Sequence, residues 1–108
     1  MQQLKAAMYV QICAHFQLPE GKFSHIETLA QSGETRRIQY YLQNETIAER
    51  NPEAVQRQCN KALRAMRELE QGVEPDDFSS LLANFESITG RAFVPPASVS
   101  AFFQKIEG

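Results

Sequence analysis

The sequence contains little of the material from which enzyme active sites and metal sites are usually built. Among its 108 residues there are two histidines and two cysteines, so a Ser-His-Asp triad or a multi-histidine metal site has almost nothing to draw on. The five glycines stand singly rather than in a phosphate-binding loop. We therefore expect no enzymatic activity, no catalytic residues, no metal site and no bound cofactor.

Long apolar runs and a strong net charge are also missing. No stretch approaches the roughly 18 apolar residues of a membrane-spanning helix, and the first ten residues lack the apolar core of a signal peptide. The formal charge of −2 gives the chain as a whole no strong attraction to nucleic acid or anionic lipid. Cys13 and Cys59 lie far apart within apolar helical patterns, which is typical of buried, reduced thiols. These features predict a cytoplasmic protein that does not contact the membrane.

What the sequence does contain is the composition and patterning of a small helical domain. Hydrophobic residues make up 43% and charged residues 22%, the balance of a soluble globular protein. Apolar residues recur at steps of three and four through most of the chain, and the only hint of a strand is the brief segment 92–94. The prediction is an all-α fold, a compact irregular bundle of five or six short helices that forms a single domain over residues 1–108.

Helix-ending and helix-capping residues predict where these helices begin and end. The first helix carries an apolar stripe over residues 4–16 and should end at the breaker-rich run 18–21. Ser24 and Glu27 have the spacing of a capping box, which places the start of a short second helix at Ser24, and Gly33 follows it as a C-cap. The remaining helices are predicted over about 34–50, 52–71, 78–88 and 96–107.

The helix between Asn51 and Gly72 is the most informative segment, because its ends and its two faces are all specified. Asn51 is a favoured N-cap, and Pro52 suits the first helical position, where its missing N–H has no intrahelical partner to lose. At about 100° per residue the apolar and basic side chains fall on nearly opposite faces. The apolar face holds Val55, Cys59, Ala62, Met66 and Leu69, and the basic face holds Arg57, Lys61 and Arg64 with Arg67 on its flank.

Each face has two interpretations. The basic face is either the solvated outside of a bundle helix, supported by an ion pair between Glu53 and Arg57, or a partner-binding surface. The apolar face either packs within the chain, which we favour, or forms a heptad seam with a second copy and so makes a homo-oligomer. The partner-binding interpretation assigns Arg57, Lys61, Arg64 and Arg67 as the contact residues.

Charge is distributed unevenly along the chain. Residues 36–67 hold seven Lys and Arg against three Glu, whereas residues 68–90 hold six acidic residues and no Lys or Arg. Opposed blocks of this kind either face each other within the fold or recruit a partner of opposite sign. Both arrangements remain open from the sequence.

Residues 26–42 resemble the start of the helix-turn-helix in MerR-type regulators. They share with that family an Ile-x-x-Leu-Ala helix, a single glycine turn and an arginine-tyrosine stretch. The spacings from Ala30 to Gly33 and from Gly33 to Ile38 are each one residue shorter than in the family, which would rotate the second helix relative to a DNA groove. The resemblance implies an alternative function, a DNA-binding regulator that uses residues 23–44. Its DNA-contacting residues would be Arg36, Arg37, Gln39 and Tyr40.

Five of the seven phenylalanines lie in the last third of the chain, at positions 78, 85, 93, 102 and 103. They either belong to the core, which we favour, or line a groove that accepts a helix. Taken together, the absent chemistry, the amphipathic helices and the segregated charge predict a small non-enzymatic protein-interaction module. It would act as an adaptor, chaperone or regulator by binding an acidic or helical partner protein through its helical surfaces.

Overall fold

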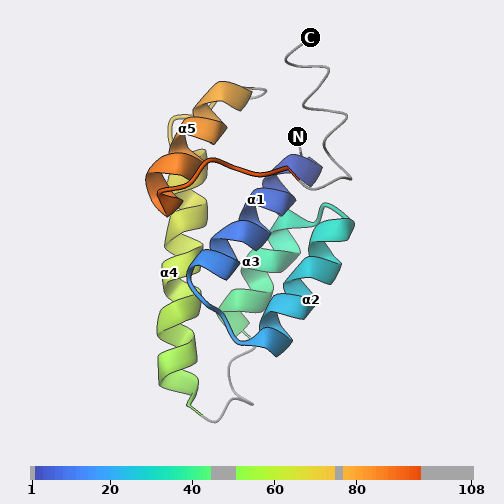
Figure 1. Cartoon of the computed structure of the whole chain (residues 1–108). Coiled ribbons are helices and arrows are strands. Elements are labelled where there is room, and N and C mark those ends of the chain that lie inside the picture. The colour runs from blue at the N-terminus through green and yellow to red at the C-terminus, as the bar shows by residue number, and fades with distance from the viewer. Residues whose placement is uncertain (1, 45–50, 75–76, 96–108) are drawn as a thin grey trace.

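Consecutive helices of the chain run in opposite directions and lie against one another (Figure 1). The computed structural model describes residues 2–44, 51–74 and 77–95. This part of the chain is a compact all-α bundle without strands, as the sequence predicts. Its five helices are α1 (Gln2–His15), α2 (Glu20–Gln31), α3 (Thr35–Asn44), α4 (Pro52–Glu70) and α5 (Phe78–Thr89).

The first helix organises the core, since α1 contacts each of the other four helices. Its buried side chains include Leu4, Met8, Ile12 and Cys13, all at most 1% exposed. Helices this short are marginal alone and are stabilised by the packing of their apolar faces. α1 therefore provides the surface on which the bundle assembles.

The two ends of α4 and its apolar face follow the sequence prediction. The Asn51 side chain accepts a hydrogen bond from the backbone N–H of Ala54 at 3.3 Å, and Pro52 is the first helical residue. Cys59, Ala62, Met66 and Leu69 are all fully buried, and Val55 is half-buried. Because α4 contacts α1, α3 and α5, this face packs within the chain and is not open to a second copy.

The second helix begins four residues earlier than the capping-box pattern predicts. α2 starts at Glu20, and the backbone N–H of Phe23 donates to the carbonyl of Pro19 at 2.9 Å. Proline, with its fixed φ and missing N–H, is compatible with the start of a helix rather than a barrier to it. Ser24 lies inside α2, so the predicted start at Ser24 is wrong.

The end of α1 forms a Schellman motif without glycine. The N–H of Leu18 donates to the carbonyl of Cys13 at 3.3 Å, and the N–H of Gln17 donates to that of Ala14 at 3.0 Å. Gln17 takes the left-handed position of this motif with a φ of 56°. Gly33, Gly72 and Gly90 adopt left-handed φ values near the ends of other helices.

Two predictions lie outside the described residues, namely the helix over 96–107 and the end of the third helix beyond Asn44. None of the described helices combines the length and the hydrophobicity needed to cross a bilayer.

Candidate functional site

The four cationic residues predicted for partner binding share one exposed surface. All four side chains are exposed, and they are referred to below as the basic face of α4: Arg57, Lys61, Arg64 and Arg67. At a rise of 1.5 Å per residue the row is about 15 Å long. Exposed Glu53 and Glu68 lie near its two ends, and the buried apolar face lies opposite. The bundle therefore holds these cations outward, on the side of α4 opposite its buried residues.

No side chain of the basic face makes an ion pair with a described residue. The ion pairs in the described part of the chain join Lys5 to Glu70 at 2.9 Å and Arg37 to Glu34 at 3.4 Å. The pair expected between Glu53 and Arg57 is not among them. The basic block, residues 36–67, and the acidic block, residues 68–90, make no ion pair with each other within the described residues. Glu70 of the acidic block pairs instead with Lys5 of α1.

A shallow depression lies beside the N-terminal end of the basic face. It has a volume of about 430 Å³ and is lined by residues of the first two turns of α4 and by Asn60. The Gln56 side-chain N–H donates to Asn60 Oδ1 at 2.9 Å, which holds both amides along its edge. A side chain of a partner could enter this depression next to Arg57.

A polar network between three helices holds α4 in place. Tyr9 of α1 donates its hydroxyl hydrogen to Glu70 Oε2 of α4 at 2.7 Å, while Lys5 Nζ lies 2.9 Å from Glu70 Oε1. Gln39 of α3 donates to the Tyr9 hydroxyl at 3.2 Å. Burial of the phenol, assisted by the hydrogen bond to Glu70, raises the pKa of Tyr9 well above its ordinary value. Sequence analysis did not identify this network, because its members come from three separate helices.

The candidate DNA-contacting residues divide between two environments. Arg36, Arg37 and Tyr40 are exposed on α3, and 67% of Tyr40 is accessible. Gln39 instead turns toward Tyr9 in the network between helices. The structure therefore brings three of the four residues together on the outside of α3.

The arrangement of α2 and α3 is that of an antiparallel helical hairpin (Figure 1). A link of three residues, 32–34, joins the two helices. DNA-reading helix-turn-helix motifs cross their helices at about 90–120°. The side-by-side packing of α2 and α3 is therefore typical of a structural helical hairpin and differs from the arrangement of a DNA-binding helix-turn-helix.

The aromatic residues of the C-terminal third contribute to the core where they are described. Phe85 and Phe93 are 2% and 8% exposed, and their rings pack edge to face at 5.3 Å. Phe102 and Phe103, which the predicted aromatic groove requires, lie outside the described residues. The described aromatic residues therefore support the core interpretation.

Both cysteines are buried thiols, as predicted. Burial, with a smaller contribution from nearby Cys59, raises the pKa of the Cys13 thiol to about 12. Cys13 is therefore an inert, protonated thiol at neutral pH. Among the described residues, no three His, Cys, Asp or Glu side chains gather as a set of metal ligands.

No protein-family model matches the chain, and no curated protein and no solved structure is significantly similar to it.

Proposed function

We propose that this chain is a small non-enzymatic protein-interaction module of the cytoplasm, acting as an adaptor, chaperone or regulator. Its binding surface is the basic face of α4, and its partner presents an acidic segment. The observation that carries the proposal is a row of four exposed cations without a carboxylate partner among the described residues.

The spacing of the row favours this function over a merely solvated face. Arg57 and Lys61 are four residues apart, and Lys61, Arg64 and Arg67 follow at steps of three. Like charges at these spacings destabilise a helix by a few tenths of a kcal/mol per pair. Glu53 and Glu68, each four residues from one cation of the row, offset part of that cost. An acidic partner would be attracted to all of these cations and would reduce the repulsion between them.

The geometry favours a partner segment that lies along α4. Side chains at steps of three and four form one stripe on a helix, so a partner helix with Asp or Glu at the same steps can face several cations at once. Such pairs at a solvated rim raise the association rate and set orientation more than they raise affinity. The interaction should therefore weaken as salt screens it.

Charge reversal on two different helices tests the proposal. The variant Lys61→Glu/Arg64→Glu changes the basic face, and Arg36→Glu/Arg37→Glu makes the same change of net charge on α3. All four side chains are exposed, so both variants should fold, which circular dichroism checks. Each protein is used in a quantitative pull-down from the native host.

We expect the α4 variant to recover roughly tenfold less partner protein than the wild type, as expected for loss of close charge pairs. The α3 variant should recover the wild-type amount. If both variants recover the same partners in wild-type amounts, the basic face is a solvated surface only.

The alternative function is DNA binding through α3, and it is favoured by the exposure of Arg36, Arg37 and Tyr40 on one helix. Phosphate contacts make affinity fall steeply with salt. Titration of a duplex DNA at about 50 mM salt, repeated at higher salt, separates the two functions. Salt-dependent binding that is lost in Arg36→Glu/Arg37→Glu and kept in the α4 variant would support the alternative, and absence of binding would exclude it.

A further inference from the structure

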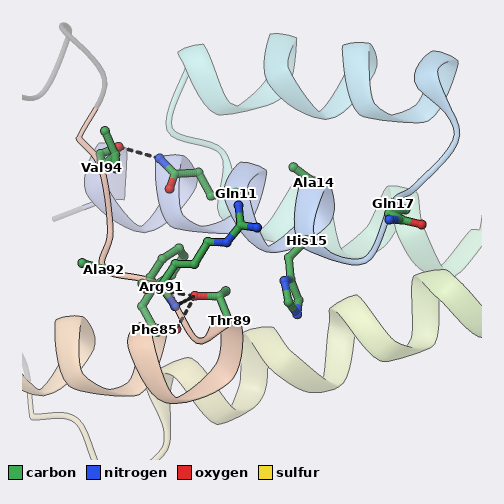
Figure 2. Close-up of a pocket in the computed structure, with 9 residues that line it drawn as sticks. All are labelled: Gln11, Ala14, His15, Gln17, Phe85, Thr89, Arg91, Ala92 and Val94. Carbon is green, nitrogen blue, oxygen red and sulfur yellow. Dashed lines mark hydrogen bonds between the residues drawn. The ribbon is translucent and has the colours of Figure 1, made fainter.

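A cavity of about 590 Å³ lies between α1, α5 and the segment that follows α5 (Figure 2). Its size is within the range of small-molecule sites. The apolar part of the lining comes mainly from Ala14, Ala92 and Val94, since Phe85 is only 2% exposed, and the polar part includes His15 and Arg91. The basic face of α4 contributes no residue to it.

The wall formed by residues 91–94 is tied to both helices. The Gln11 side-chain N–H donates to the carbonyl of Val94 at 2.6 Å, across 83 positions of sequence. The Arg91 backbone N–H donates to the Thr89 hydroxyl at 3.2 Å, just after the end of α5. Phe93 is anchored in the core against Phe85. These contacts connect the wall to both α1 and α5.

Arg91 supplies positive charge to this space. Figure 2 shows its side chain extending from the segment after α5 toward α1, between Gln11 and His15. The cavity lining includes no described Asp or Glu, and Arg91 makes no ion pair with a described residue. His15 adds a ring N–H donor in either neutral tautomer. The cavity therefore combines an uncompensated guanidinium with an apolar surface.

We propose that this cavity binds a small organic acid with one carboxylate and an apolar body, for example an arylalkanoate. The carboxylate would form paired hydrogen bonds with the Arg91 guanidinium, and the apolar body would lie against the exposed side chains of Ala14, Ala92 and Val94. Because α1 and α5 both end at the cavity, their partial negative charge opposes any anion. Arg91 can offset that opposition for a single carboxylate, whereas a dianion such as phosphate carries a second negative charge that no other cation of the lining faces. This binding site does not depend on the partner-binding function of α4.

The test uses the full 108-residue chain and hydrocinnamate, followed by NMR chemical shifts of the backbone amides. Wild-type protein should show saturable binding with a dissociation constant of about 1 mM or lower. The shifts should concentrate in residues 11–17 and 89–94. Arg91→Gln should weaken binding roughly tenfold, because it removes a charged hydrogen-bonding partner.

Matched variants separate the cavity from general effects of charge and size. Arg36→Gln removes an exposed cation on α3 and should leave binding unchanged. Ala14→Phe should block the cavity, whereas Ala83→Phe, at an exposed position of α5 that does not line it, should not. Each variant gives its own amide spectrum, which reports whether the fold is retained.

Four results would overturn the proposal. They are no saturable binding up to about 20 mM, equal binding by Arg91→Gln and wild type, shifts that map outside the cavity, and equal binding of the uncharged amide or of inorganic phosphate. Failure here would leave the function of the basic face of α4 untouched, because the two sites share no residue.

Discussion

Removal of the Tyr9 hydroxyl should destabilise the bundle measurably. Tyr9 is 1% exposed, and its hydroxyl both donates to Glu70 at 2.7 Å and accepts from Gln39 at 3.2 Å. A hydrogen bond to a charged group contributes about 1.5–3 kcal/mol. Water can partly replace it here, because 36% of the Glu70 side chain is exposed. We expect Tyr9→Phe to lower the free energy of unfolding by about 1.5 kcal/mol.

Urea unfolding followed by circular dichroism near neutral pH measures this loss, and the slope with urea should stay unchanged. A thermal scan should show a midpoint lower by roughly 6–12 °C for a domain of this size. Tyr40→Phe is the matched control, since Tyr40 is 67% exposed and its change should stay within about 0.5 kcal/mol. Equal effects of the two substitutions would refute the network.

A double-mutant cycle assigns the loss to the correct partner. Tyr9→Phe and Glu70→Gln should be less than additive, with a coupling of about 1 kcal/mol. Additive effects would mean that the hydroxyl stabilises the bundle in some way other than its bond to Glu70.

Two further predictions concern stability. The Cys13 thiol ionises near 9.0 when unfolded and near 12 in the fold, so the unfolded state holds fewer protons in this window and stability falls as pH rises. Urea unfolding should show a loss of about 1.4 kcal/mol from this thiol between about pH 8 and pH 10. The loss should be smaller in Cys13→Ala, and an equal loss in that variant would contradict the assignment. Gln17→Gly relieves a left-handed φ of 56° and should raise stability by about 0.5–1 kcal/mol; an unchanged or lower thermal midpoint would argue against strain at that position.

The parts of the fold that were predicted correctly depend on local chemistry. The cap at Asn51, the first-turn Pro52 and the apolar stripe of α4 involve residues within a few positions of one another. Their energetics are therefore contained in a short segment. The exposure of Lys61 and Arg64 follows from the same periodicity, since the side opposite a buried stripe faces solvent.

The start of α2 was predicted wrongly because two local signals compete. Ser24 and Glu27 have capping-box spacing, but Pro19 can precede a first turn equally well. The earlier start lets Lys22 bury its stem and lie over the Tyr41 ring, with Nζ 5.0 Å from the ring centroid. Such packing depends on α3 and is invisible within the α2 segment.

The features of the candidate sites that the sequence did not predict depend on contacts between helices that are far apart in the chain. Gln11 and Val94 form one wall of the cavity although 83 positions separate them. Arg91 follows Gly90 at the end of α5, and no neighbouring residue in the sequence marks it as part of a site. Likewise, Glu53 and Arg57 have the sequence spacing of an ion pair on a helix, but their side chains do not form one in the structure.

The most direct measurement of the central claim is site-specific photo-crosslinking from the basic face of α4. Asn60 is exposed within that face, and a photoreactive phenylalanine analogue there should crosslink to the partner recovered by pull-down. The same analogue at exposed Gln43 of α3 should give little crosslink. A partner that crosslinks from Gln43 and not from Asn60 would contradict the assignment of α4 as the binding surface.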